Sequence, residues 1–349
     1  MRNLNSILLT NPKVVERDSA VILTRASMAR NLADYKFSIL NNATDRKNLF
    51  NLIKQVTGKI DKLGNFRLYN LSNMPKLKRK LLLEKDIISH QMTREIMGKG
   101  ILVNNEIDEM LASIMVNEED HLVIQCSSPG LKIEKVYHKV SKVEKCLEDK
   151  LSFAFDRDLG YLTSCPINVG SGFKLSVALH LPAMVVNYKI DDLVDRLNKI
   201  NCTISGYRTQ DSEIIGNLFI LSKQSTLEKG DRDTVEEMKA ICLNIIDGEK
   251  KQIENLKKEK PLTVKDSVYR AYGVLKYARL LSFEEALELL SMVSLGKQLG
   301  LFSSLKRFDF YYLINIIGNS YLRSLDGNKN KSIDEIDRKR ANIIKEEIF

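Results

Sequence analysis

Apolar residues recur three and four positions apart in two stretches of the first hundred residues. The stretch 46–57 has Leu49, Leu52 and Ile53 at this spacing, and the stretch 76–90 has three leucines followed by two isoleucines. This period places the apolar side chains on one face of a helix. The pattern predicts two helices connected by loops in this part of the chain.

After residue 100 the pattern changes to short apolar runs bounded by turn-forming residues. These runs read SIMVN, HLVIQ, LGYLTSC, KLSVALHL and GNLFILSKQ, and the range 190–200 between two of them has a helical pattern. Short runs rich in β-branched residues are typical of strands. The sequence therefore predicts a sheet with flanking helices.

Helical patterns fill the last third of the chain. The letters T-V-E-E from Thr234 have the spacing of a capping box and predict the start of a long helix, which continues into the charged run 247–260. Further on, Ser282 is placed to cap a helical segment, and 333–349 has the pattern of a last charged helix.

Pro261 ends the charged run and marks a hinge between two parts of different composition. We expect a first domain over residues 1–255, which contains the sheet and a helical N-terminal part. Residues 256–349 are expected to form a small all-helical domain. The fold class predicted from these patterns is α+β.

The net charge of +9 comes from 54 Lys and Arg against 45 Asp and Glu in 349 residues. The basic residues are mixed with acids, and the one local basic run, 76–80, is read as a solvated helix face. A nucleic-acid partner is therefore not expected.

The five cysteines are widely spaced, without a CxxC pair or a cluster of histidines. This spacing argues against a disulfide framework and against a zinc site. The N-terminus lacks the apolar core of a signal peptide, and the chain has no run of 18 apolar residues. We expect a cytoplasmic protein with no membrane segment and no metal site of its own.

Three acids and a histidine, N-E-E-D-H at 117–121, stand directly before a predicted strand. A solvated acidic turn would explain them, and so would a strand that carries a general base. Two further segments, 156–182 and 205–224, follow in the order D-R-D-L-G-Y-L-T-S-C-P-I-N-V-G-S-G and S-G-Y-R-T-Q-D-S-E-I-I-G-N-L-F.

In this order the three segments resemble the catalytic domain of the ATP:guanidino phosphotransferases, and most closely the bacterial protein-arginine kinases. Further similar stretches begin at Ala29 (ARNLADYKF), Leu81 (LLLEKDIISHQMTRE) and Tyr269 (YRAYGVLKYARLLSFEEALELLSMVSLG). The resemblance covers nearly the whole chain. It implies a phosphagen-kinase-like catalytic domain with an antiparallel sheet, and ATP with Mg²⁺ as cofactors.

The reaction implied by the resemblance is the phosphorylation of arginine side chains in proteins. A guanidinium is a poor nucleophile while protonated, so a carboxylate must orient it and accept a proton. The resemblance assigns this role to Glu119, with Glu118 beside it.

The resemblance also implies a ring of arginines around the transferring phosphoryl group, and here that ring is depleted. Arg25 is retained, Lys174 replaces an arginine, and Ser27, Val123 and Ser205 are neutral where the family has arginine. A single transition-state arginine can contribute ~10³–10⁵ in rate, and lysine lacks the bidentate geometry of arginine. We therefore expect weak or lost catalysis.

Asp86 stands where the family has a histidine that helps to hold the nucleotide, and its charge would oppose ATP. Arg208 is the one visible compensation for the loss at Ser205, although an exposed loop arginine is the simpler interpretation. The ATP-binding positions carried over are Thr24, Arg25, Ser27, Asp86, Lys174, Leu175, Ser176, Ser205, Gly206 and Arg208.

Substrate-positioning roles are carried over to Cys165, Asn168 and Gln210, the last of which replaces an acid. A lone cysteine is more often buried filler. The glycines at 170 and 172 would let backbone N–H groups approach a phosphate, although a simple turn explains them equally.

The family carries an R-D-x-x-R-A motif that binds phosphoarginine on other proteins, and here Asp337 and Arg340 match it while Ile336 does not. A charged, solvated helix face is the alternative. The partners implied by the resemblance are proteins that bear arginine or phosphoarginine, a zinc-binding activator protein and an unfoldase–protease, with a homodimer as a further possibility.

Three functions remain open at this stage. The first is a working protein-arginine kinase, and the second is a pseudokinase that retains the fold as a docking scaffold in protein quality control. The third, a kinase acting on free guanidino compounds, is disfavoured because the helical C-terminal part resembles that of the protein-directed enzymes.

Overall fold

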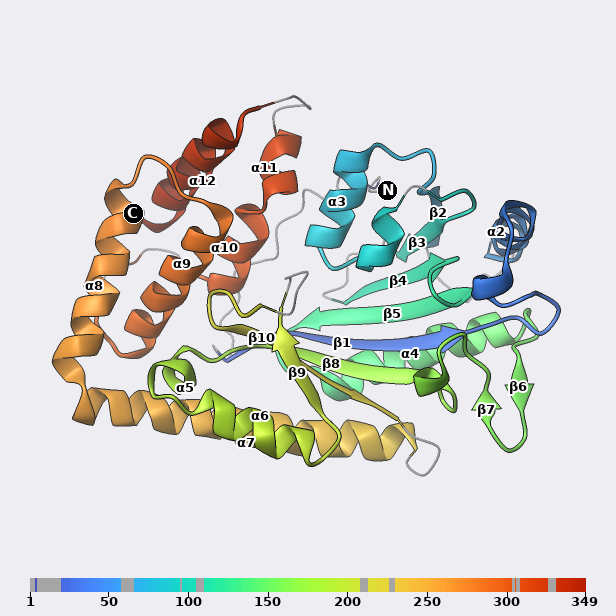
Figure 1. The fold of residues 1–349 in the computed structure, drawn as a ribbon, viewed down its shortest axis with the longest axis horizontal. Helices are drawn as coiled ribbons and strands as arrows, with labels where there is room; N and C mark the ends of the chain where they lie inside the picture. The colour runs from blue at the N-terminus through green and yellow to red at the C-terminus, as the bar shows by residue number, and fades with distance from the viewer. Residues whose placement is uncertain are drawn as a thin grey trace. The chain divides into compact units, whose positions relative to one another are not determined.

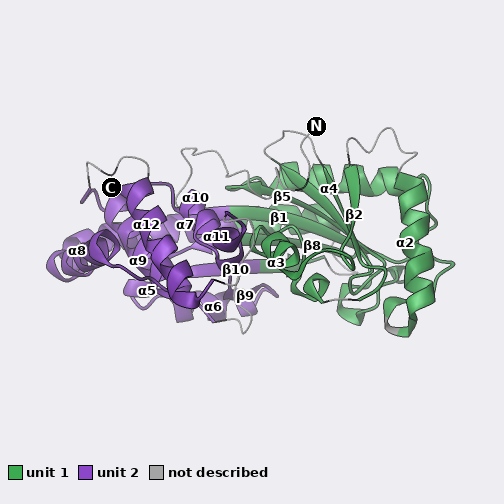
Figure 2. Ribbon diagram, turned by 90° about the horizontal axis from the view of Figure 1, so that it is seen from above, with its two compact units in different colours: residues 1–8, 23–177, 222–240 green, residues 9–22, 178–221, 241–349 purple. Residues whose placement is uncertain are grey.

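The computed structural model describes residues 4, 20–57, 66–94, 96–104, 110–207, 213–225, 230–302, 305, 308–325 and 331–349. Contacts divide the chain into two compact units, each built from separate stretches of sequence (Figure 2). The first unit comprises 1–8, 23–177 and 222–240, and the second 9–22, 178–221 and 241–349. The boundary expected near residue 255 stays a prediction.

An eight-stranded sheet has the order β2-β3-β4-β5-β1-β8-β10-β9. Its strands are β1 (Val21–Arg30), β2 (Phe66–Asn70), β3 (Gly100–Asn104), β4 (Leu111–Val116), β5 (Leu122–Pro129), β8 (Phe173–His180), β9 (Thr203–Gly206) and β10 (Leu218–Gln224). The pairs β1–β5, β2–β3, β3–β4 and β4–β5 are antiparallel. A small second sheet pairs β6 (Phe155–Asp156) with β7 (Gly160–Tyr161).

Helix α4 (Ile133–Glu148) covers one face of the sheet in the first unit (Figure 1). Its buried residues Val136, Val140, Val143 and Leu147 are spaced to form one apolar stripe. Arg30 of β1 reaches this helix and forms an ion pair with Glu144, with a distance of 2.9 Å from Nη2 to Oε1. Because side chains alternate along a strand, the neighbours of Arg30 at every second position also face α4.

The remaining helices of the first unit are α2 (Ala43–Thr57) and α3 (Lys76–Glu84), with short 3₁₀ turns η1 (Ser38–Leu40), η3 (His90–Thr93) and η4 (Pro166–Asn168). The two helices predicted from apolar spacing are therefore confirmed, but the second one ends six residues earlier than expected. Asp86 follows it in the left-handed region, with φ of +56°, and this conformation cannot continue a right-handed helix.

Helices make up most of the second unit. They are α5 (Pro182–Val186), α6 (Ile190–Asn198), α8 (Pro261–Tyr277), α9 (Phe283–Gln298), α10 (Phe310–Ile316), α11 (Asn319–Leu325) and α12 (Ile333–Ile348), and α7 (Asp231–Glu259) contributes its later part. One apolar core joins several of them through Ala183, Ile253, Leu256, Val264, Val268 and Leu295.

Capping explains where several of these helices begin. The predicted cap at Ser282 is confirmed, since its hydroxyl accepts a hydrogen bond from the Glu285 N–H. The long helix predicted to begin near Thr234 is confirmed as α7, but the predicted capping box at Thr234 is wrong. The helix begins at Asp231, and the Thr234 hydroxyl lies inside it and donates to the Gly230 carbonyl oxygen.

A buried carboxylate caps the first turn of α5. Leu181, at the N-cap position, offers no side-chain bond. Instead, the Glu249 carboxylate of α7, which is 1% exposed, accepts hydrogen bonds from the N–H groups of Ala183 (2.7 Å) and Met184 (2.9 Å). Burial raises the pKa of Glu249 to about 7, and the two N–H groups partly oppose this shift.

Among the residues that the structure describes, no helix is both long and apolar enough to cross a membrane.

Candidate active site

The acidic motif forms the tight turn between β4 and β5. Asn117 adopts a left-handed backbone with φ of +58°, and its N–H donates to the carbonyl oxygen of His121 at 3.0 Å. The Asn117 side-chain amide donates to the carbonyl oxygens of Arg46 and Gly98. Asparagine tolerates this backbone better than most residues, so its place in the motif has a structural cause.

Asp120 and His121 are fully buried and serve as structural anchors. Asp120 Oδ1 accepts hydrogen bonds from the Asn31 amide at 2.7 Å and from the Ser164 N–H at 2.6 Å. His121 Nδ1 accepts from the Leu32 N–H, so its Nε2–H is free to donate to the Lys36 carbonyl oxygen at 2.8 Å. Burial lowers the pKa of His121, and the ring stays neutral around pH 7.

Glu118 and Glu119 have different surroundings. Glu118 accepts hydrogen bonds from the Ser89 hydroxyl and from the Glu119 N–H, both at 2.6 Å. Glu119 is exposed and its carboxylate makes no hydrogen bond or ion pair with any described residue. Desolvation, then the charges of Glu118 and Asp120, raise the pKa of Glu119, while Lys174 lowers it. Glu119 is thus an available carboxylate with an increased affinity for a proton.

The sheet face opposite α4 carries the predicted phosphate-binding positions. Strand register pairs Arg25 with Ser127, Ser27 with Gln125, and Ala29 with Val123. Directly opposed residues project to the same face of a sheet. Val123 therefore lies in the row of Arg25 and Ser27, so the site face at its position offers an apolar side chain and no cation.

Lys174 of β8 is a cation near Glu119. Partial desolvation lowers its pKa, the charge of Arg25 lowers it further, and the charge of Glu119 raises it. Lys174 is therefore an electrostatic neighbour of both Arg25 and Glu119, and it retains exposed surface. In this way Lys174 connects the predicted base with the retained arginine.

Arg25 already has an anionic partner. Its Nη2 lies 2.7 Å from Oδ1 of Asp86, and the two side chains are only 24% and 13% exposed. Among the described residues, the arginine that remains in the predicted phosphate set is therefore paired with Asp86, the acid that stands where the resemblance implies a histidine.

Two predicted ATP-binding residues do not reach this face with their side chains. Thr24 is fully buried; its hydroxyl donates to the Gly130 carbonyl oxygen at 2.6 Å and accepts from the Lys132 N–H at 3.2 Å. Leu175 is fully buried and lies on the same face of β8 as Phe173, whose ring contacts Tyr137 of α4. Adjacent residues of a strand point to opposite faces of the sheet. Thr24 is adjacent to Arg25 and Leu175 to Lys174, so their side chains point away from the site face.

Ser176 is on the same side of β8 as Lys174, and its hydroxyl lies 2.8 Å from the Ser222 hydroxyl. Ser205 and Gly206 are part of β9 in the second unit. Arg208 and Gln210 lie outside the described residues. The ligand-binding roles of all these residues stay predictions.

The Cys165 loop is fixed to the acidic turn through the bond between the N–H of Ser164 and Asp120. The carbonyl oxygen of Cys165 accepts from the Thr163 hydroxyl and from the Asn168 N–H. The side-chain Oδ1 of Asn168 accepts from the side-chain amide of Gln224 at 2.5 Å. The loop is thus hydrogen-bonded to the motif, and Cys165 is half-buried. Its substrate-positioning role stays a prediction.

The predicted phosphate-cradling glycines have a packing role. Gly172 has φ of +60°, and a Cβ added there would lie 2.7 Å from the carbonyl oxygen of Ala29. The Ala29 N–H donates to the Gly172 carbonyl oxygen. Glycine is therefore required at 172 by the close approach of β1.

Three residues that support the motif were not predicted. Ser89 binds Glu118, and Asn31 binds Asp120. Lys99 is buried, and its Nζ donates to the Gln91 carbonyl oxygen. Burial lowers the pKa of Lys99, and the charge of Glu118 partly opposes this shift. Asn31 and Ser89 lie within the similar stretches that begin at Ala29 and Leu81, but nothing in those stretches links either single residue to the motif.

In the second unit, Arg340 is fully buried on α12. Its guanidinium donates to the carbonyl oxygens of Ile317 (2.9 Å) and Leu281 (2.5 Å), to Asp337 Oδ1 (2.5 Å) and to the side-chain oxygen of Asn319. These bonds join four segments. The predicted phosphoarginine-docking pair therefore has a structural role, and docking by Asp337 and Arg340 stays a prediction.

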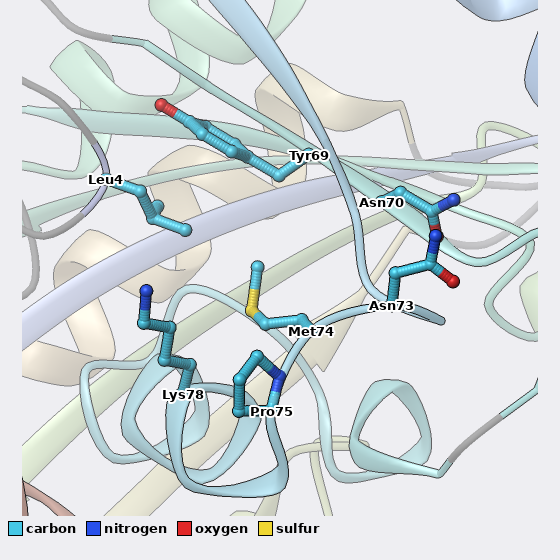
Figure 3. Close-up of a pocket in the computed structure, with 7 residues that line it drawn as sticks. All are labelled: Leu4, Tyr69, Asn70, Asn73, Met74, Pro75 and Lys78. Atoms are coloured by element: carbon cyan, nitrogen blue, oxygen red, sulfur yellow. The ribbon is translucent and has the colours of Figure 1, made fainter. Parts of the chain in front are cut away.

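A cavity of about 330 Å³ lies away from the acidic turn, at β2 and the start of α3 (Figure 3). It is lined by Leu4, Tyr69, Asn70, Asn73, Met74, Pro75 and Lys78. None of these residues belongs to the predicted site. In the described part of the chain, no group of three or more His, Cys, Asp or Glu residues could hold a metal ion.

Comparison with protein families gives two matches. Residues 48–252 match the ATP:guanido phosphotransferase C-terminal catalytic domain, and residues 261–349 match the protein-arginine kinase McsB C-terminal domain. The protein-arginine kinase of Halothermothrix orenii is 36% identical over 332 residues, covering 95% of this chain and 93% of the relative. That of Syntrophomonas wolfei is 35% identical over 341 residues, covering 97% and 94%.

Solved structures support the fold. A lombricine kinase has 20% identity and a TM-score of 0.54, with 71% of this chain and 70% of that chain covered. A duplicated taurocyamine kinase from Schistosoma mansoni with bound transition state analog components has 23% identity and a TM-score of 0.55, with 70% and 34% covered. The predicted α+β fold, an antiparallel sheet with flanking helices followed by a helical region, is confirmed. The chain belongs to the protein-arginine kinase family.

Proposed function

We propose that this chain is a protein-arginine kinase whose ATP-dependent phosphorylation of arginine side chains is weak or lost. One observation carries the proposal: an available carboxylate, Glu119, stands beside a sheet face on which Arg25, the arginine retained among the described phosphate-binding positions, is paired with an acid. The carboxylate that would accept a proton from the guanidinium is present, but cations that would bind the phosphates are depleted.

Glu119 suits the guanidino half of the reaction. Its oxygens can accept hydrogen bonds from the N–H groups of a substrate guanidinium, and its raised pKa favours proton acceptance. Glu118, fixed by Ser89, adds negative charge that attracts the same cation. The rigid loop of Cys165 and Asn168 is proposed to position the substrate next to them.

The residues present fit a nucleotide poorly. Phosphoryl transfer depends on fixed cations around the phosphates, and on the described site face Lys174 is the cation without an acidic partner. Mg²⁺ would have to arrive with the nucleotide, because no described cluster could hold it. When bound, Mg·ATP supplies the phosphoryl group.

The test is incubation of the full chain with Mg·ATP and an arginine-rich protein acceptor, followed by measurement of acid-labile, base-stable phosphate. We expect a low yield that Glu119→Gln reduces by a further ~10²–10⁴-fold, the usual contribution of a general base. Asp149→Asn, which removes an exposed acid at the end of α4, is the matched control and leaves the yield unchanged. Brisk turnover by the unaltered chain would contradict the proposal.

A second candidate function is a pseudokinase scaffold in protein quality control. The observation that favours it is the contrast on β1 and β5: phosphate-binding positions 27 and 123 are neutral, while the residues facing α4, including Ala26, Ile124 and Cys126, are fully buried. Under this hypothesis, the core is retained although phosphate-binding cations are missing, because the fold serves a function other than phosphoryl transfer.

Under this second function the chain binds proteins bearing arginine or phosphoarginine, a zinc-binding activator protein and an unfoldase–protease in the cytoplasm. Self-association into a homodimer is part of the same proposal. No phosphoarginine, no rise in melting temperature with Mg·ATP, and co-purification of such a partner would support the scaffold. Phosphoarginine formation that depends on Glu119 would exclude it.

A further inference from the structure

The turn after α3 is built so that it presents Asp86 to the sheet. The Asp86 N–H donates to the Leu83 carbonyl oxygen at 2.9 Å and the Ile87 N–H to the Leu82 carbonyl oxygen at 3.0 Å. These two bonds, together with the left-handed backbone of Asp86, form the Schellman motif that ends many helices. Ile87 is buried and fixes the exit of the chain.

The left-handed position of this motif is one that glycine adopts most easily. Here an aspartate holds it, with φ of +56°. A side chain at this position is not needed to end the helix, because the two backbone bonds do so. The role of the Asp86 carboxylate must therefore be found in what it contacts.

Two bonds tie Asp86 to the site face. Its carboxylate binds Arg25 of β1 at 2.7 Å, and its carbonyl oxygen accepts from the Gln125 amide of β5 at 2.8 Å. Gln125 opposes Ser27, so both contacts come from the face that carries the phosphate-binding positions. The ion pair is mostly removed from solvent, with side chains 24% and 13% exposed.

Arg25 keeps part of its binding capacity unused. Its Nε is buried and has no hydrogen-bond partner in the described structure. The guanidinium is held by one carboxylate oxygen through Nη2. If that carboxylate moves away, the guanidinium can bind an anion through two parallel hydrogen bonds.

We propose that Asp86 is a specificity-determining residue: its carboxylate occupies the anion-binding position of Arg25 and thereby excludes polyphosphate ligands from the sheet face. This inference rests on the proposed function, because it places the phosphates of a nucleotide against Arg25 and Lys174. A polyphosphate must either displace Asp86 from Arg25 or bind beside an uncompensated negative charge, and like charges in contact oppose binding strongly.

The experiment measures affinity and not turnover. Isothermal titration of the full chain with Mg·ATP and with inorganic tripolyphosphate compares the unaltered protein with Asp86→Asn. Asparagine tolerates the left-handed backbone, so the Schellman turn is kept while the charge is removed. We expect the dissociation constant for both ligands to fall at least about tenfold, which corresponds to one lost like-charge contact of about 1.4 kcal/mol.

Two further variants make the test specific. In the double variant Asp86→Asn with Arg25→Gln the gain disappears, because the freed arginine is its source. Asp149→Asn, which removes an equal charge from the exposed residue that follows α4, gives no gain. An unchanged affinity in Asp86→Asn, a gain that survives Arg25→Gln, an equal gain from Asp149→Asn, or no measurable binding by either the unaltered chain or Asp86→Asn would overturn the inference.

Failure of this inference is distinguishable from failure of the proposed function. Tighter binding by Asp86→Asn without any phosphoarginine leaves the inference standing and favours the scaffold. Phosphoarginine formation by the unaltered chain with no effect of Asp86→Asn on affinity leaves the kinase standing and removes the inference.

Discussion

Glu249 makes the free energy of unfolding depend on pH in a calculable direction. Its pKa is about 7 in the folded chain and about 4.5 when the carboxyl is exposed on unfolding. Between these values the folded state binds the proton more tightly than the unfolded state. The contribution of Glu249 is therefore fully present below pH 4.5 and is lost as the pH rises through 7.

The size of this effect follows from the two pKa values. A difference of about 2.5 pH units at about 1.4 kcal/mol per unit corresponds to about 3–4 kcal/mol, most of which falls between pH 5 and pH 8. Glu249→Gln removes the titrating group and keeps its shape. One N–H of α5 then loses an acceptor, at a pH-independent cost of about 1–3 kcal/mol.

The assay is urea unfolding of both proteins at several pH values from 5 to 8, followed by far-ultraviolet circular dichroism. We expect the unaltered chain to lose about 2–3 kcal/mol relative to Glu249→Gln across this range. Glu259→Gln, an exposed acid on the same helix, should track the unaltered chain. A difference between the unaltered chain and Glu249→Gln that stays flat, or that grows with pH, would refute the reasoning.

Three further outcomes are expected. Arg340→Lys should destabilise the chain by about 3–5 kcal/mol in the same denaturant assay, because it removes the hydrogen bonds of a buried guanidinium. Arg338→Lys, at an exposed position of α12, should have no effect. Thr24→Val should reduce stability by about 1–3 kcal/mol through its buried hydroxyl bonds and leave Mg·ATP affinity unchanged in calorimetry; a selective loss of affinity would restore it to the nucleotide site. Val123→Arg combined with Ser205→Arg should tighten Mg·ATP binding if missing cations are the defect, and no gain would count against that explanation.

The sequence predicted the strands at β4, β5, β8 and β10 because each contains a short apolar run bounded by turn-forming residues. It did not predict β1, although this strand lies at the centre of the sheet beside β5 and β8. Thr24, Arg25 and Ser27 interrupt its apolar pattern. The polar residues that belong to the candidate site are therefore the ones that concealed the strand carrying them.

The sequence identified several residues of the candidate site, but it did not predict how they interact. Glu119, Arg25 and Lys174 could be named from the motifs, and the structure brings them together. The ion pair between Arg25 and Asp86 could not be predicted, because it joins residues 61 positions apart. The outward pattern of a strand would have placed Thr24 away from Arg25, but only once β1 was known to be a strand.

The four-segment hub at Arg340 has a consequence for any ligand that would engage this side chain. Such a ligand has to take the guanidinium away from the carbonyl oxygens of Leu281 and Ile317, which hold the ends of neighbouring helices. Occupancy would then favour an opened arrangement of α11 and α12. Amide hydrogens there would exchange faster with deuterium in the complex than in the free protein, the reverse of the protection that a ligand normally gives.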